Sequence, residues 1–168
     1  MTESGVTNTM YEKMESVIRN MLKIFKKDIS VQTLENLTQF VLFGIVGVSN
    51  TVISYLLNIM VLGLLSPFRL VWDYIAGNLV AFLLSVLWSF YWNNRIVFTQ
   101  GEGQSRNLWK ALLKAYAAYG FTGIVLNNIL SWVWISMFHI SKYIAPLINL
   151  VISVPLNFVI NKLWTFKD

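Results

Sequence analysis

Residues 36–68, NLTQFVLFGIVGVSNTVISYLLNIMVLGLLSPF, form a stretch of 33 residues that contains no Asp, Glu, Lys or Arg. Three further uncharged stretches follow at 74–94, 115–141 and 143–161. A bilayer core is crossed by about 20 mostly apolar helical residues, and each stretch reaches or approaches that length. The pattern therefore predicts an all-α, polytopic membrane protein with four transmembrane helices, at 37–62, 73–92, 115–138 and 143–162.

The composition argues against several classes of function. Only 12% of the 168 residues are charged, against about 25% in soluble domains. The absence of cysteine excludes disulfides and thiolate metal sites, and the single His139 leaves little for an imidazole site. The sequence also lacks a P-loop motif and paired carboxylates, and the four predicted spans contain no acid except Asp73 at the outer boundary of the second. We therefore expect neither an enzyme nor a bound metal or cofactor.

Basic residues predict the orientation of the chain, because cytoplasmic ends of membrane helices carry an excess of Lys and Arg. Only Arg69 and Lys142 lie on one predicted side. The other side holds Lys13, Arg19, Lys23, Lys26, Lys27, Arg95, Arg106, Lys110, Lys114, Lys162 and Lys167. Both termini are therefore expected in the cytoplasm, with the helices in the cell membrane. This bias also explains the net charge of +5 without nucleic acid.

Residues 1–36 are expected to form a cytoplasmic N-terminal segment with an amphipathic helix at 10–27. Its apolar residues recur at the spacing of one helical face: Met10, Met14, Val17, Ile18, Met21 and Phe25. Such a helix can lie in the plane of the lipid headgroups, where its basic residues are attracted to anionic lipid. Docking of a partner protein is the alternative interpretation.

The ends of the second and fourth predicted helices resemble each other. SFYWNNRIVF at 89–98 aligns with NFVINKLWTF at 157–166, at a spacing of 68 residues. The first and third helices match more weakly, with FGIVG at 43–47 beside YGFTG at 119–123. We therefore expect two parallel repeated hairpins, related by an axis along the membrane normal.

Each predicted span carries a face of small or polar residues, and these faces predict a groove between the helices. The residues expected to line the groove and to contact a polar ligand are Asn50, Asn78, Asn127, Asn149 and Ser153. The alternative for these positions is packing, because small residues and side-chain amides also hold membrane helices together.

A cluster of asparagine, basic and aromatic residues occurs twice, at the cytoplasmic ends of the second and fourth helices. Arginine and lysine are natural partners for a lipid phosphate. The clusters predict phosphate binding by Asn93, Asn94, Arg95, Asn157, Asn161 and Lys162. A basic residue at a helix end is otherwise only a topology signal. Trp164, Phe98 and Phe166 are expected to anchor these ends at the membrane interface.

Two motifs resemble those of the GtrA-like family. F-x-x-x-G-x-x-G-x-x-N reads FVLFGIVGVSN at 40–50, and N-[RK]-x-W-T-F reads NKLWTF at 161–166. The matching segment of the second helix, NNRIVF at 93–98, lacks the tryptophan. The resemblance covers residues 37–168, which we take as the transmembrane domain, and leaves the N-terminal helix as an extension.

The resemblance implies a role in cell-surface polysaccharide synthesis. Family members are associated with moving polyprenyl-phosphate-linked sugars from the cytoplasmic to the outer leaflet, where a separate glycosyltransferase uses them. Related domains are fused to dolichol-phosphate mannose synthases. We therefore expect a flippase for a polyprenyl-phosphate-linked monosaccharide, with a polyprenyl-phosphate glycosyltransferase as partner. Because four helices are few for a translocation path, we expect a homodimer or larger assembly. A non-transporting scaffold that recruits the transferase and a flippase of bare polyprenyl phosphate are the alternatives.

Overall fold

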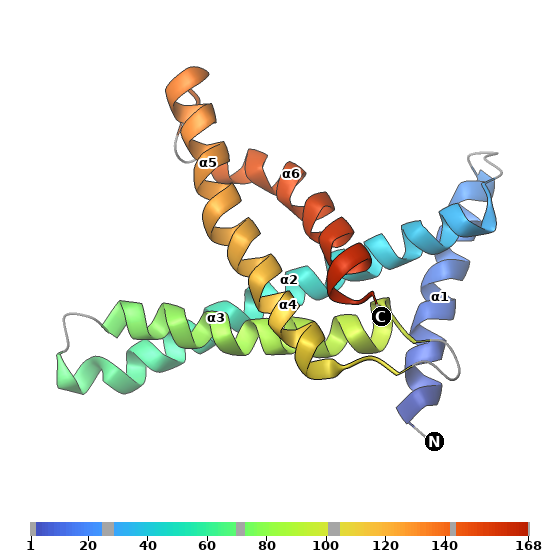
Figure 1. Ribbon diagram of the computed structural model, residues 1–168, viewed down its shortest axis with the longest axis horizontal. Helices are drawn as coiled ribbons and strands as arrows, with labels where there is room; N and C mark the ends of the chain where they lie inside the picture. Colours follow the sequence, from blue (N-terminus) through green and yellow to red (C-terminus); the bar gives the residue numbers. More distant parts are fainter. Residues whose placement is uncertain (1–2, 25–28, 70–72, 101–104, 142–143, 168) are drawn as a thin grey trace. The chain divides into compact units, whose positions relative to one another are not determined.

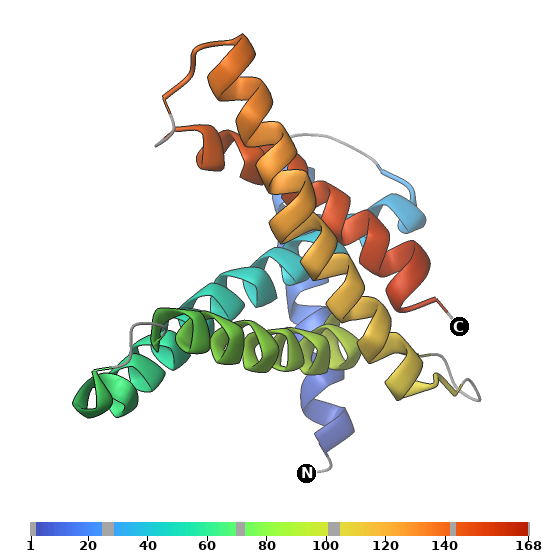
Figure 2. The same ribbon diagram turned by 60° about the vertical axis from the view of Figure 1, so that its left-hand side comes forward.

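The computed structural model describes residues 3–24, 29–69, 73–100, 105–141 and 144–167, and all regular structure in these ranges is helical. Phe25, Lys26, Lys27 and Lys142, which carry part of the predicted charge and amphipathic patterns, lie outside the described residues. The chain divides into two compact units, Met1–Thr99 (unit 1) and Gln100–Asp168 (unit 2), and each is described by itself. Figure 1 shows the helices in sequence colours, and Figure 2 turns the same view by 60°.

Unit 1 is a long helical hairpin with a further helix against it. It contains α1 (Glu3–Ile24), α2 (Val31–Leu65), the short 3-10 turn η1 (Ser66–Phe68), α3 (Asp73–Trp92) and the π-helical turn η2 (Asn93–Val97). α2 and α3 pack side by side in both views (Figures 1 and 2). α3 has the bounds predicted for the second helix.

α2 is longer than the first predicted helix at both ends. Ser30 caps it, because its side-chain oxygen accepts a hydrogen bond from the Thr33 backbone N–H at 3.2 Å. Its 35 residues span about 52 Å, whereas a bilayer core is about 30 Å thick. The prediction took the last charge, at Glu35, as the limit of the helix. A helix continues through charged residues that lie in water, so hydropathy alone misplaced its start.

α1 packs against α2 and η2 within unit 1. Ile18 is buried and Met14 is half-buried. Met10, Val17 and Met21, on the neighbouring side of the helix, keep 44%, 53% and 54% of their surface exposed. α1 therefore has one apolar side on unit 1 and another that is uncovered. Its location in the headgroup plane stays a prediction.

Unit 2 is a second helical hairpin. Its first arm runs without a break through α4 (Leu108–Gly120), η3 (Phe121–Leu126), α5 (Asn127–Trp132) and η4 (Val133–Met137). Its second arm is α6 (Ala145–Ile160) followed by η5 (Asn161–Thr165). The segments η3, η4 and η5 are π-helical, a wider turn that often occurs at functional sites. Asn107 caps α4 by accepting from the Lys110 backbone N–H at 3.0 Å, so this arm begins before the predicted start at 115.

The two units end on the same local structure. η2 begins at Asn93 and η5 at Asn161, and both asparagines are buried. The asparagine carbonyl accepts from the backbone N–H five residues further on, at Phe98 and Phe166, and both bonds measure 2.8 Å. These matched turns favour the predicted repeat, which stays a prediction for the four helices as a whole.

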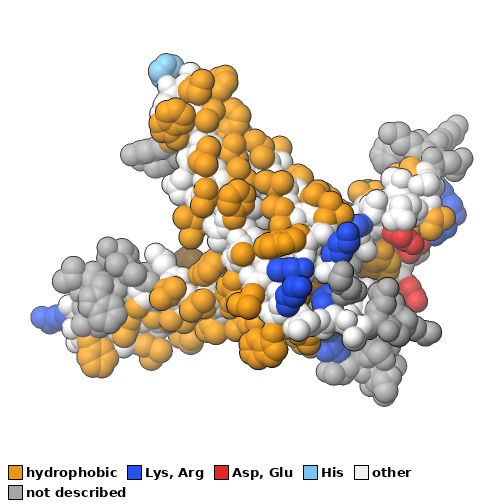
Figure 3. Space-filling model, in the orientation of Figure 1, with side chains coloured by type: hydrophobic (Ala, Val, Ile, Leu, Met, Phe, Trp, Pro, Cys, Tyr) orange, Lys and Arg blue, Asp and Glu red, His pale blue; other side chains and the backbone are white. Residues whose placement is uncertain are grey.

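Over the described residues, three helical segments are long and apolar enough to cross a membrane: Val31–Phe68, Leu108–Met137 and Ile148–Thr165. α3 is not among them, and the predicted second span stays a prediction. Val48, Leu64, Ile124 and Val151 on these segments are between 63% and 75% exposed. Figure 3 shows hydrophobic side chains over the visible face of α5 and α6. Large exposed apolar surfaces are rare in water-soluble monomers, so this surface faces lipid and the chain is a multi-pass membrane protein.

Candidate functional site

A polar cavity lies between the two arms of unit 2. It has a volume of about 360 Å³ and is lined by Thr122, Gly123, Asn127, Asn149, Leu150, Ser153, Val154 and Asn157. Three predicted groove residues, Asn127, Asn149 and Ser153, therefore share one cavity with the predicted phosphate ligand Asn157. The lining comes from η3 and α5 on one arm and from α6 on the other. None of these described lining residues carries a charge.

Asn149 connects the two arms beside this cavity. It is buried, and its amide nitrogen donates to the Asn127 backbone carbonyl at 3.1 Å, to the Ser131 hydroxyl at 2.8 Å and to the Asn127 side-chain oxygen. Its side-chain oxygen accepts from the indole N–H of Trp134 at 2.9 Å. One side chain on α6 therefore holds α5 and η4 in position.

Asn157 forms a second connection between the arms. The Thr122 hydroxyl donates to the Asn157 side-chain oxygen at 2.7 Å, and the Asn161 amide donates to the Asn157 backbone carbonyl at 2.8 Å. Asn161 is buried, and its own side-chain oxygen has no hydrogen-bond partner within the described ranges. Asn157, which lines the cavity, is therefore hydrogen-bonded to Asn161 at the start of η5.

The predicted site residues of unit 1 lie on the α2–α3 hairpin and at its end. Asn78 accepts a hydrogen bond from the Asn58 amide at 2.9 Å, which joins α2 to α3. Asn50 has a buried side-chain oxygen without a hydrogen-bond partner in the described part of the chain. Asn93 donates to the Ser89 hydroxyl at 3.0 Å. Two of these asparagines therefore have interhelical or intrahelical packing roles in addition to any contact with a ligand.

Both predicted phosphate-binding cations lie over an aromatic ring of their own helix. The Arg95 guanidinium lies 5.6 Å from the Tyr91 ring centroid and donates to the Tyr91 hydroxyl. The Lys162 ammonium lies 5.7 Å from the Phe158 ring centroid. Cation–π contacts of this kind fix the direction of a long side chain. Lys162 does not line the polar cavity, and Asn94 is half-buried beside Arg95.

The three predicted interface anchors differ in exposure. Trp164 keeps 47% of its surface exposed, whereas Phe98 and Phe166 keep 6% and 4%. The ring centroids of Phe98 and Phe43 lie 6.2 Å apart. The two buried phenylalanine rings belong to the packed interior, because a ring at the headgroup level would remain exposed. We keep the proposal of an interface anchor for Trp164 alone.

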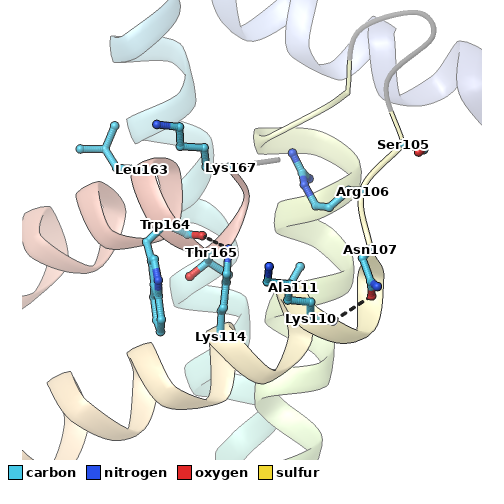
Figure 4. Close-up of a pocket in the computed structure, with 10 residues that line it drawn as sticks. All are labelled: Ser105, Arg106, Asn107, Lys110, Ala111, Lys114, Leu163, Trp164, Thr165 and Lys167. Atoms are coloured by element: carbon cyan, nitrogen blue, oxygen red, sulfur yellow. Dashed lines mark hydrogen bonds between the residues drawn. The ribbon is translucent and has the colours of Figure 1, made fainter.

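A second pocket in unit 2, also of about 360 Å³, lies between the start of α4 and η5 (Figure 4). Arg106, Lys110, Lys114 and Lys167 line it, and we call it the basic pocket. The prediction counted these residues only as cytoplasmic charges. The available signal was the four-residue spacing of Lys110 and Lys114, since positions four apart share one face of a helix, whereas Arg106 precedes the N-cap of α4.

Aromatic rings and backbone groups of η5 position the cations of the basic pocket. The Lys114 ammonium donates to the Trp164 backbone carbonyl at 2.8 Å, drawn as a dashed line in Figure 4, and lies 5.9 Å from the Trp164 ring centroid. The Arg106 guanidinium lies 5.2 Å from the Phe166 ring centroid. Unit 2 therefore offers two chemically different sites, a neutral cavity suited to hydroxyl groups and a cationic pocket suited to an anion.

A known family of membrane domains matches most of the chain. The family model described as GtrA/DPMS, transmembrane domain, matches residues 42–166, which include the hairpin of unit 2 and all but the first part of α2 in the hairpin of unit 1. No curated protein and no solved structure matches the chain significantly. The family match covers well over half of the 168 residues. The chain therefore belongs to the GtrA/DPMS transmembrane-domain family.

Proposed function

We propose that this protein translocates a polyprenyl-phosphate-linked monosaccharide from the cytoplasmic to the outer leaflet, for glycosylation of surface polysaccharide. Its family membership gives it a membrane role related to polyprenyl-linked sugars. The observation that carries the further step is the polar cavity of unit 2, which lies along segments long enough to cross a membrane. Such a cavity gives a polar headgroup hydrogen-bonding partners inside the apolar layer.

The chemistry and size of the cavity fit one sugar ring. Asn127, Ser153 and Asn157 line it with partly exposed amide and hydroxyl groups, which can donate to and accept from sugar hydroxyls, whereas the buried Thr122 and Asn149 hold the two arms in place. Pockets for small molecules measure about 300–1,000 Å³, and this cavity of about 360 Å³ lies at the small end. A monosaccharide is therefore a better fit than a longer glycan.

The prenyl chain and the phosphate stay outside the cavity in this proposal. The prenyl chain lies against the exposed apolar surface of the spans. The phosphate lies at the cytoplasmic ends of the helices, near the clusters that begin at Asn93 and Asn157. The predicted contact of Asn50 and Asn78 in unit 1 with the substrate stays a separate prediction. Use of the sugar by a glycosyltransferase outside drives net transport, and the working form is a homodimer or larger assembly.

The experiment measures flipping in proteoliposomes. The probe is a polyprenyl-phosphate-linked hexose, and the readout is the rate at which it becomes accessible to a membrane-impermeant reagent. Ser153→Leu places an apolar side chain in the cavity, and we expect it to abolish the acceleration that the wild type gives. Ser136→Leu makes the same change at an exposed position of η4 and should flip at the wild-type rate. A Ser153→Leu variant as fast as the wild type would contradict the proposal.

Two further arms of the experiment test the alternatives. With bare polyprenyl phosphate as the probe, acceleration that Ser153→Leu leaves intact, together with no acceleration for the sugar lipid, would indicate a flippase of the carrier alone. The uncovered apolar side of α1 is the observation that favours a recruiting scaffold. Val17→Gln/Met21→Gln would then abolish association with the glycosyltransferase, and the wild type would not accelerate flipping of either lipid.

A further inference from the structure

The basic pocket of unit 2 has the composition of an anion site. Arg106, Lys110, Lys114 and Lys167 contribute four cations, and the lining residues that the structure describes include no Asp or Glu. Basic side chains are charged at neutral pH, and a concave surface of one sign concentrates its field on a ligand of the opposite sign. A phosphate group, with several charged oxygen atoms, suits several lysines and an arginine at once.

A buried hydroxyl in the same wall also points to a ligand. Thr165 lines the pocket and is 1% exposed, and its Oγ1 has no hydrogen-bond partner within the described residues. Burying a hydroxyl without a partner is unfavourable unless a ligand or water completes the bond. Thr165 follows Trp164, whose backbone carbonyl holds the Lys114 ammonium at 2.8 Å, so a hydroxyl and a fixed cation adjoin in one wall.

The surroundings of the pocket favour a lipid as the source of the phosphate. Exposed apolar side chains alternate with the cations along both segments: Leu108, Trp109, Leu113, Leu163 and Trp164 are between 47% and 77% exposed. Figure 3 shows basic side chains beside hydrophobic ones near the C-terminus of the chain. Such a mixed surface suits the membrane interface, where apolar groups enter the acyl layer and basic groups meet phosphate.

We propose that the basic pocket binds the phosphate of the polyprenyl carrier lipid at the cytoplasmic surface, which rests on the proposed function above. Arg106, Lys110 and Lys114 supply the charge and Thr165 supplies a hydroxyl. In unit 2 these residues take the role predicted for Lys162, whose ammonium lies over the Phe158 ring and which does not line the pocket. The prenyl chain leaves the pocket past the exposed apolar residues of α4.

The test measures binding to the full-length chain in nanodiscs of phosphatidylcholine. The probes are geranylgeranyl phosphate, geranylgeraniol, which lacks the phosphate, and inorganic phosphate. Lys110→Gln/Lys114→Gln should weaken binding of geranylgeranyl phosphate by roughly 10- to 100-fold, about a factor of ten for each charge-assisted hydrogen bond removed. Binding of geranylgeraniol should not change. Lys13→Gln/Lys23→Gln removes the same charge from exposed positions of α1 and should bind as the wild type does.

Further measurements distinguish a loss of binding from a loss of folding and test whether Lys162 binds the phosphate. Thermal unfolding of Lys110→Gln/Lys114→Gln is measured beside binding, and its melting temperature should remain that of the wild type. Thr165→Val removes only the hydroxyl and should also weaken binding of geranylgeranyl phosphate. Lys162→Gln should bind geranylgeranyl phosphate with the wild-type affinity. A loss of affinity as large as that of Lys110→Gln/Lys114→Gln would indicate that Lys162 binds the phosphate, as first predicted.

The remaining outcomes of the binding measurements also support or overturn the proposal. Equal affinities of Lys110→Gln/Lys114→Gln and Lys13→Gln/Lys23→Gln would overturn it, and so would a wild type that binds inorganic phosphate as tightly as the lipid. An equal loss for geranylgeraniol would show a prenyl groove and no phosphate site. If Lys110→Gln/Lys114→Gln bound geranylgeranyl phosphate with unchanged affinity and the wild type still flipped the sugar lipid, the phosphate site would be overturned and the proposed function would stand. Pocket-dependent binding in a protein that flips no lipid would overturn the proposed function alone.

Discussion

Replacing Asn149 by alanine should loosen the hairpin of unit 2. The substitution removes hydrogen bonds to Asn127 at 3.1 Å, to Ser131 at 2.8 Å and to Trp134 at 2.9 Å, together with the contact to the Asn127 side chain. Interhelical hydrogen bonds in membrane proteins contribute about 0.6–1.7 kcal/mol each, so the three partners together account for about 2–5 kcal/mol of the free energy of unfolding.

Two further substitutions identify the cause of the loss. Asn149→Asp keeps the volume and the acceptor for Trp134, but it replaces the amide donor by oxygen opposite the Asn127 carbonyl. We expect it to destabilise unit 2 at least as much as alanine does. Asn128→Ala is the matched control, because Asn128 is exposed and its amide donates only to its own helix, at the Ile124 carbonyl, 2.6 Å away. It should stay within about 0.5 kcal/mol of the wild type.

The measurement is equilibrium unfolding in detergent micelles, followed by tryptophan fluorescence and by circular dichroism. A free energy of unfolding for Asn149→Ala within about 0.5 kcal/mol of that for Asn128→Ala would refute the reasoning. Destabilisation by Asn149→Asp without destabilisation by alanine would also refute it, because the cause would then be a buried charge and not the loss of connecting hydrogen bonds.

Three further predictions concern unit 1. Gly77→Ala would place a methyl group 3.1 Å from the Asn58 amide nitrogen, so it should lower the stability of the α2–α3 hairpin by about 1–3 kcal/mol in thermal unfolding. Ser30→Ala removes the N-cap of α2 and should cost about 1 kcal/mol in the same assay. Burial, followed by the charge of Glu35, raises the pKa of Tyr11 above its ordinary value of 10.0. The stabilising effect of neutral Tyr11 is therefore complete below pH 10.0 and is lost as the pH rises through the folded-state pKa. Tyr11→Phe should remove this alkaline destabilisation, measured as the melting temperature across the alkaline range.

The sequence predicts where helices cross the apolar layer better than it predicts where they begin. A span must exclude charge over most of its length, so uncharged stretches locate it, and three of the predicted spans overlap segments that are long and apolar enough to cross a membrane. A helix start depends on a side chain that satisfies free N–H groups, as Ser30 and Asn107 do for α2 and α4. These caps lie among charged and polar residues outside the apolar stretches, where hydropathy gives no boundary.

Only part of the polar cavity could be predicted from the sequence. Asn149, Ser153 and Asn157 recur every four residues on α6, so their common face could be predicted from helical geometry. On the opposite wall Asn127 was also predicted, but Thr122 was not, and η3 interrupts this arm with a π-helical turn. A π turn contains more residues than an α turn and rotates every later side chain around the helix axis. The partnership between Asn149 and Trp134, which lies beyond η3, therefore had no signal in a helical wheel.

The cations of the basic pocket show how a topology signal and a binding site can use the same residues. Orientation in the membrane requires only that Lys and Arg lie on the cytoplasmic side, and mutual repulsion favours their dispersal. In unit 2 they converge instead, since Arg106, Lys110, Lys114 and Lys167 line one pocket. Contacts with the rings of Trp164 and Phe166 offset part of this repulsion. A bound phosphate would offset the rest, so convergence without acidic neighbours in the described wall is better explained by a ligand than by orientation.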